Sequence, residues 1–147
     1  MFNFKELLGD VFKEDSHEYS VIELSYQIIA GTIPSTPAEM KNQMIQLDQQ
    51  RTELSTLYYL INRKIMYLRE DLQKESDATY VRLVKLGRPS KDAIETELRA
   101  TNSVYAVNSL KIAQFENVKE LVLSYIRSID SRKQTVIELL RNAYRVD

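Results

Sequence analysis

The chain has 147 residues, 44% of them hydrophobic, which is enough for the core of one domain and excludes a disordered tail. It has no cysteine, which excludes disulfides, thiolate catalysis and cysteine zinc sites and suits a reducing cytoplasm. Three glycines, three prolines and no tryptophan leave little turn chemistry for a strand-rich fold, so the composition predicts an all-α protein.

The net charge of −1 conceals an uneven distribution. The formal charge is −5 over residues 1–61, +4 over residues 62–91 and zero over residues 92–147. No signal segment begins the chain, and no window approaches the roughly 18 apolar residues of a membrane span. We therefore expect a soluble cytoplasmic protein without a membrane partner, formed by one helical domain over residues 1–147.

Residues 1–31 are predicted to form short N-terminal helices. After a first short docking helix, a second helix begins at a cap, Asp15 or Ser16, and ends at Ala30, with Gly31 as its C-cap. The predicted apolar face of this helix contains Tyr19, Ile22, Tyr26 and Ile29.

Residues 32–37 are read as a linker, followed by a long helix over residues 37–86. Thr36, Pro37 and Glu39 have the pattern of a capping box with proline at the first helical position. Apolar residues then recur at alternating intervals of four and three, which is the spacing of a helix packed on other helices. The seam positions are Met40, Met44, Leu47, Arg51, Leu54, Tyr58, Ile61, Ile65, Leu68 and Leu72. A helix over the seam is on the order of 50 Å long, which predicts an elongated, self-associating protein.

A turn over residues 87–90 separates this helix from a second long helix over residues 90–145. Ser90 is the predicted N-cap, and a kink is expected near Asn102 or Asn108. Two long helices joined by a short turn form an antiparallel hairpin. The wide apolar face of the second helix favours an oligomeric helical assembly.

Basic residues near tyrosines are the strongest functional feature. Lys and Arg neutralise phosphates while tyrosine rings stack on bases, which is the sequence-independent mode of single-stranded DNA binding. The predicted DNA-binding residues are Arg63, Lys64, Tyr67, Arg69, Arg82, Lys85, Arg88 and Lys91. The alternative is a solvated helix face and an ordinary basic turn, because the excess of positive charge is modest. Repeating a weak patch in a homo-oligomer raises its avidity.

Charged residues also interrupt the apolar positions. Arg51 lies in the seam, and Lys119 and Lys133 occupy comparable places on the last helix. Such charges specify register or oligomer state, or line a pore. The acidic N-terminal region is interpreted as solvated surface, with a basic partner as the alternative.

No pattern indicates catalysis, a metal site or a cofactor. His17 is the single histidine, and glycine is too sparse for a phosphate-binding loop. The carboxylates near Glu70 and Glu75 have no matching ligands on a second helix. We therefore do not expect an enzyme.

The order of these parts resembles the tailed-phage recombination mediator family, the UvsY-like proteins. Arg63-Lys64-Ile65-Met66-Tyr67 stands where the family has its basic and tyrosine motif, with an adjacent basic pair in place of basic-x-basic and Leu68 in place of the second tyrosine. Ser90-Lys91-Asp92-Ala93-Ile94 stands where the middle helix restarts, and Ile129-Asp130-Ser131-Arg132 matches a later pattern. The resemblance spans roughly residues 20–145.

The resemblance implies a ring of six or seven subunits assembled through the C-terminal helix. Such a ring binds single-stranded DNA, loosens the single-strand-binding protein and helps to load the strand-exchange recombinase, without covalent chemistry. The corresponding oligomerisation positions are Val122, Ile126, Ile129, Arg132, Val136 and Leu140. The alternative hypothesis is a helical coiled-coil interaction or assembly module that has no nucleic-acid role.

Overall fold

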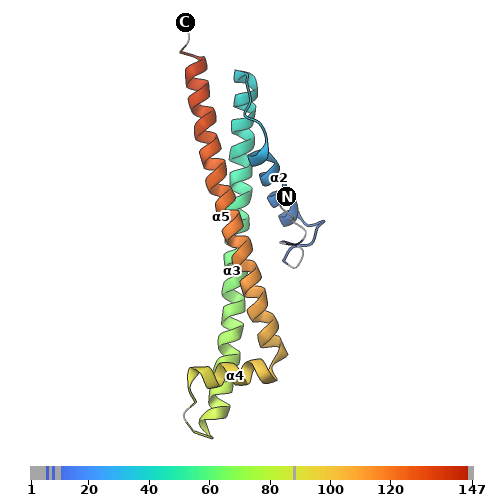
Figure 1. Ribbon diagram of the computed structural model, residues 1–147, viewed down its shortest axis with the longest axis vertical. Helices are drawn as coiled ribbons and strands as arrows, with labels where there is room; N and C mark the ends of the chain where they lie inside the picture. The colour runs from blue at the N-terminus through green and yellow to red at the C-terminus, as the bar shows by residue number, and fades with distance from the viewer. Residues whose placement is uncertain (1–5, 7, 9–10, 88, 146–147) are drawn as a thin grey trace. The chain divides into compact units, whose positions relative to one another are not determined.

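The structure is a computed structural model that describes residues 6, 8, 11–87 and 89–145. Its helices are α2 (His17–Ala30), α3 (Pro37–Val84), α4 (Lys91–Thr101) and α5 (Ser103–Ala143) (Figure 1). These described residues contain no strand, which confirms the prediction of an all-α protein. Most of the predicted first short helix lies outside the described residues.

The three predicted helix starts are confirmed, because each N-cap side chain accepts a hydrogen bond from the backbone. Ser16 Oγ accepts from the N–H of Tyr19 at 3.2 Å, and Ser90 Oγ accepts from the N–H of Ala93 at 3.1 Å. Thr36 Oγ1 accepts from the N–H of Glu39 at 3.3 Å. These bonds satisfy backbone donors that a helix start leaves without intrahelical partners.

Gly31 is the C-cap of α2, as predicted, but for a different reason. Its φ of −74° is extended rather than left-handed. A Cβ atom at this position would lie 3.2 Å from the carbonyl oxygen of Gln27, so close approach of the backbone favours glycine here. Gly87, which follows α3, has a φ of 137° that other residues rarely adopt.

The prediction of one helix over residues 90–145 is wrong. Asn102 is in an extended conformation, with φ −122° and ψ 96°, and separates α4 from α5. Its Oδ1 accepts from the N–H of Tyr105 at 3.0 Å, so the side chain caps the start of α5. Asn102 was one of the two positions where a kink was expected. At the other boundary, α3 ends at Val84, two residues before the predicted end.

The chain divides into two compact units. Unit 1 contains residues 1–60 and 118–147, and unit 2 contains residues 61–117. Unit 1 therefore holds α2, the first half of α3 and the C-terminal part of α5. Unit 2 holds the second half of α3, α4 and the N-terminal part of α5.

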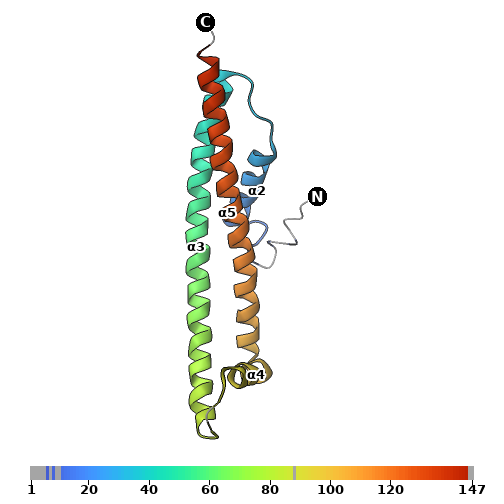
Figure 2. The ribbon, with the colours of Figure 1, turned by 60° about the vertical axis from the view of Figure 1, so that its left-hand side comes forward.

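In unit 1, α2 lies beside α3 and α5 (Figure 2). Gln50, which is only 5% exposed, donates from Nε2 to the carbonyl oxygen of Val21 at 2.8 Å and to Ser25 Oγ at 2.6 Å. This buried polar bridge places Ser25 in the core, whereas Tyr26 is partly exposed. The predicted face of α2 is therefore corrected. The buried residues of α2 are Tyr19, Val21, Ile22, Ser25 and Ile28.

Charged residues in the seam of unit 1 form ion pairs within the chain. Arg51 donates to both carboxylate oxygens of Asp130, at 2.6 and 3.3 Å, and this hydrogen bonding raises the pKa of Arg51 above its usual value. Lys133 pairs with Asp48. Both pairs join α3 to α5. Arg51, three residues after Asp48 on α3, pairs with Asp130, which lies three residues before Lys133 on α5. These charges thus specify an antiparallel register inside one chain.

The predicted oligomerisation positions all lie in unit 1, and most are in its core. Val122, Ile126, Ile129 and Val136 are at most 9% exposed in the single chain, while Leu140 is half-buried. A side chain that its own chain covers offers no apolar surface to a second copy. These four side chains therefore pack within one chain, and their role in oligomerisation stays a prediction.

Arg132, the one charged residue among the predicted oligomerisation positions, connects three segments of unit 1. Its guanidinium donates to Gln43 Oε1 at 3.2 Å, to the carbonyl oxygen of Ile29 at 3.2 Å and to that of Thr32 at 2.6 Å. Ile29 belongs to the last turn of α2, which contains no basic residue of its own. Arg132 therefore supplies from α5 a cation for the carbonyl end of α2.

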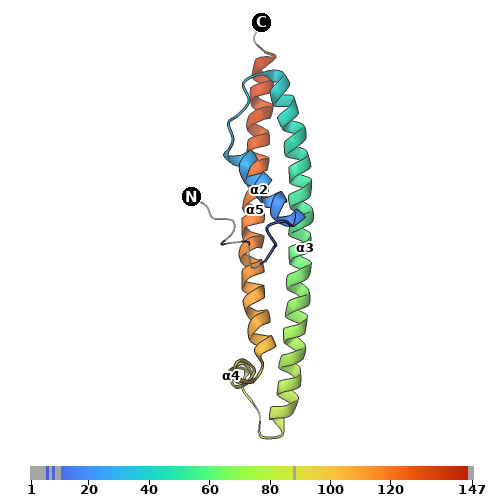
Figure 3. The same cartoon turned by 90° about the vertical axis from the view of Figure 1, so that its right-hand side faces the viewer.

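In unit 2, the seam of α3 continues as Ile61, Ile65 and Leu68, all at least 93% buried. α4 crosses α3 in this unit (Figure 1) and is seen nearly end-on beside α5 in Figure 3. Leu98 is its fully buried residue. The N-terminal part of α5 leaves Val104, Val107 and Leu110 at least half exposed. This apolar stripe has no partner within the described part of unit 2.

Candidate nucleic-acid interface

Seven of the eight predicted DNA-binding residues lie in unit 2, and the eighth, Arg88, lies outside the described residues although its position falls within the same unit. Residues 61–117 contain ten basic and eight acidic residues, which gives a formal charge of +2. This net positive charge is small, so the ion pairs of the individual cations decide how much positive charge is left for a ligand.

The first group of predicted residues lies near the start of unit 2. Arg63 Nε donates to the hydroxyl of Tyr67 at 3.0 Å, and the guanidinium carbon lies 5.5 Å from the centre of the Tyr67 ring. Tyr67 remains 45% exposed, and Lys64 is exposed without an ion pair among the described residues. The arrangement places Arg63 beside an accessible ring, with exposed Lys64 next to it in the chain, and electrostatic binding combined with base stacking uses such groups.

Two predicted cations are neutralised by carboxylates from other helices. Arg69 of α3 pairs with Glu116 of α5, and Arg82 pairs with Glu97 of α4 at 3.1 Å. The stretch from residue 80 to residue 91 contains no acidic residue, yet Glu97 of α4 cancels the charge of Arg82. These two residues contribute less to an attractive surface than their sequence context indicates.

The second group lies at the turn after α3. Lys85 and Lys91 are exposed and form no ion pair in the part of the chain that the structure describes. Tyr80 is 46% exposed, and Leu86, at 85%, is among the most exposed apolar side chains. Residues 80–91 therefore include two exposed cations and one accessible aromatic ring.

The two groups are separated along α3. From Arg63 to Arg82 the helix rises by about 30 Å at about 1.5 Å per residue. The predicted residues therefore form two small basic and aromatic groups on the same unit rather than one cluster. A single strand of about nine stacked nucleotides, at about 3.4 Å each, can span the distance between the two groups.

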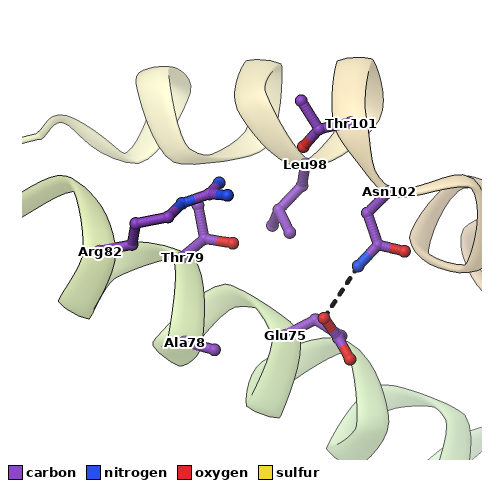
Figure 4. Close-up of a pocket in the computed structure, with 7 residues that line it drawn as sticks. All are labelled: Glu75, Ala78, Thr79, Arg82, Leu98, Thr101 and Asn102. Atoms are coloured by element: carbon purple, nitrogen blue, oxygen red, sulfur yellow. Dashed lines mark hydrogen bonds between the residues drawn. The ribbon is translucent and has the colours of Figure 1, made fainter.

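A cavity of about 320 Å³ lies between α3 and α4, at the second group (Figure 4). Sequence reasoning did not identify it as a site. Its main lining residues are Glu75, Thr79, Arg82, Leu98, Thr101 and Asn102. The one available sequence signal was Thr79, a polar residue that continues the seam by seven-residue steps from Leu72.

Within the described residues, no three His, Asp or Glu side chains are grouped so that they could hold a metal ion. Among the same residues, no helix has both the length and the hydropathy needed to cross a bilayer.

Comparison of the chain with protein-family models, with curated proteins and with solved structures finds no match.

Proposed function

We propose that this protein is a non-enzymatic, single-stranded DNA-binding mediator of recombination, as its resemblance to the UvsY-like family implies. The observation that carries the proposal is the pair of basic and aromatic groups in unit 2. Arg63 and Lys64 accompany Tyr67, and Lys85 and Lys91 accompany Tyr80. Phosphate neutralisation and base stacking at these groups need no sequence-specific contact.

The proposed role consists of binding alone. A strand held at two points is given a defined conformation, and a ligand shifts such an equilibrium by its different affinity for the two forms. We propose that this favours the form used by the strand-exchange recombinase over the form covered by the single-strand-binding protein. No covalent step and no cofactor take part. The location is the cytoplasm, that of the host if a phage encodes the chain.

Association of several copies strengthens this proposal, because four exposed cations per chain give weak binding. We propose a homo-oligomer, a ring of six or seven subunits, in which a long antiparallel hairpin is the repeating element. Since the C-terminal face of α5 is covered in the single chain, the contact is assigned to the exposed stripe of Val104, Val107 and Leu110. Replacing Val107 by Asp would then dissociate the assembly, because an unpaired charge in an apolar contact is costly.

A salt titration tests DNA binding directly. The affinity of the assembled protein for a dye-labelled single strand is measured by fluorescence anisotropy over a range of salt concentrations. The logarithm of the affinity should fall linearly with the logarithm of the salt concentration, by about 0.7 per phosphate contact. The double substitution Arg63→Ala with Lys64→Ala should make this slope shallower by about 1.4.

A matched control removes two positive charges from unit 1 instead. Lys13 and Arg141 are exposed, and neither forms an ion pair within the described residues. Lys13→Ala with Arg141→Ala should leave the slope nearly unchanged. An equal effect of both double substitutions would show a general charge effect, and no binding at low salt would end the proposal.

A helical assembly module without a nucleic-acid role is the second candidate. The pairing of Arg69 and Arg82 with carboxylates favours it, because it reduces the positive surface. Sedimentation of the pure protein with and without labelled single-stranded DNA separates the two candidates. The assembly module would form the same oligomer and leave the DNA unbound.

A further inference from the structure

We propose that the cavity between α3 and α4 takes one unstacked base of the bound strand and prefers cytosine to thymine. This inference rests on the proposed function, which brings a single strand to the neighbouring basic turn. The cavity volume of about 320 Å³ lies at the small end of the range for ligand pockets, which suits one base rather than a larger ligand.

The side chain of Thr79 is the first feature of the cavity that indicates a ligand. The residue is only 7% exposed, and its hydroxyl forms no hydrogen bond within the described residues. Figure 4 shows this hydroxyl on the side of α3 that faces α4. Among the described residues no fully buried side-chain oxygen lacks a partner, so the Thr79 hydroxyl keeps some accessible surface in the cavity and can contact a bound polar group.

The charges of the cavity select the kind of ligand. Glu75 supplies a carboxylate, which accepts from Asn102 Nδ2 at 2.8 Å and retains further acceptor capacity. Arg82 supplies a guanidinium, of which one N–H group donates to Glu97. A phosphate would be repelled by Glu75, and a metal cation would be repelled by Arg82. A neutral ligand with hydrogen-bond donors and acceptors on one edge suits both charges.

A nucleobase has such an edge and a planar apolar face. Leu98, which is 2% exposed, provides an apolar wall for that face. Cytosine presents an exocyclic amino group as a donor to a carboxylate, whereas thymine presents a carbonyl oxygen at the corresponding position. The carboxylate of Glu75 would therefore favour cytosine, and the guanidinium of Arg82 would donate to the cytosine carbonyl.

The cavity also lies where a strand would pass. Arg82 lines it, and exposed Lys85 follows one turn later along the chain. A phosphate attached to the inserted nucleotide can therefore meet a cation while its base occupies the cavity. Taking one base out of the stack holds the strand in a defined conformation, which is the property that the proposed function needs.

The test compares two labelled strands of equal length, one of cytosines and one of thymines, by fluorescence anisotropy. The unaltered protein should bind the cytosine strand roughly tenfold more tightly, as expected for one good polar contact to a base. Glu75→Gln and Thr79→Val should each bring the affinity ratio toward one. Glu70→Gln, which changes the same charge at an exposed position of α3, should leave the ratio unchanged.

Thr79→Val keeps the shape of the side chain, so it guards against loss of folding, and thermal melting followed by circular dichroism checks each variant. Equal affinity of the unaltered protein for the two strands would overturn the inference. A ratio that neither variant changes would also overturn it. In both cases DNA binding itself, and hence the proposed function, would stand.

If neither strand binds at low salt, the proposed function fails, and the cavity is judged separately. The Leu98 methyl signals are then followed by NMR during titration with deoxycytidine monophosphate and thymidine monophosphate. A shift with the cytidine nucleotide alone supports the inference, and no shift with either nucleotide refutes it.

Discussion

Removing the guanidinium of Arg132 should destabilise unit 1. In Arg132→Met, the side chain keeps most of its apolar length but loses its bonds to Gln43, Ile29 and Thr32. A hydrogen bond to a charged group contributes about 1.5 to 3 kcal/mol. Because the side chain is only half-buried, water replaces part of this interaction. We therefore expect the free energy of unfolding to fall by roughly 2 to 3 kcal/mol in total.

Urea unfolding followed by circular dichroism measures this change. Arg132→Lys is the matched variant, because its ammonium keeps the charge but cannot form the planar fork of the guanidinium. It should recover roughly 1 kcal/mol. The amide protons of residues 28–36 should exchange faster in Arg132→Met than in the unaltered protein, since this segment loses its tie to α5.

The opposite result would refute the reasoning. If Arg132→Met dissociated the oligomer in sedimentation experiments while leaving the unfolding midpoint unchanged, Arg132 would act between copies of the chain. Its hydrogen bonds inside unit 1 would then contribute nothing to the free energy of unfolding.

Three further substitutions test individual contacts. Gln50→Glu should lower the free energy of unfolding by about 3 kcal/mol at neutral pH, as measured by urea unfolding, because it places a buried carboxylate against the Val21 carbonyl oxygen and Ser25 Oγ. Gln49→Glu, at the exposed neighbouring position, should have little effect. Burial raises the pKa of Tyr125 from 10.0 to about 12 in the folded state. Between pH 10 and pH 12 the unfolded state therefore loses the phenolic proton while the folded state keeps it, so the free energy of unfolding should fall as the pH rises through this range. Tyr125→Phe should remove up to about 2 kcal/mol of that fall, measured as the difference between the two unfolding curves. Asn102→Ala should cost about 1 to 2 kcal/mol and speed hydrogen exchange at the amide of Tyr105, and an unchanged rate there would contradict the capping role.

The elements that the sequence predicted well are those fixed by neighbouring residues. Ser16, Thr36 and Ser90 each cap a helix through an N–H group three residues later, so the information is local. The seam of α3 is similarly a matter of spacing along one helix. Six of its ten positions are buried, namely Met40, Leu47, Leu54, Ile61, Ile65 and Leu68, whereas Met44, Tyr58 and Leu72 are partly exposed and Arg51 is exposed.

The break at Asn102 depends on a residue distant in sequence. Asparagine is compatible with both a helix interior and a cap, so its identity does not decide between a kink and a break. In the structure, its amide donates to Glu75, which lies 27 residues earlier on α3. The junction of α4 and α5 is thus stabilised by a tertiary contact that no local pattern could reveal.

The candidate site shows the same limit more strongly. The charge run that includes Arg82 and Lys85 looks continuous in sequence, yet Arg82 faces Glu97 of α4 and Lys85 has no such partner among the described residues. Which cations remain available depends on which helices cross, and charge counting along the chain does not contain that information.

Under the proposed function, the pairing of Arg69 and Arg82 makes association of several copies more important for DNA binding. If Arg63, Lys64, Lys85 and Lys91 each meet one phosphate, a single chain gives a salt slope of only about 2.8. Contacts of that number give weak binding at physiological salt, but successive copies on one strand act at high effective concentration. A substitution such as Val107→Asp, which we expect to separate the copies without altering any of these four cations, should therefore weaken DNA binding about as strongly as loss of the cations themselves.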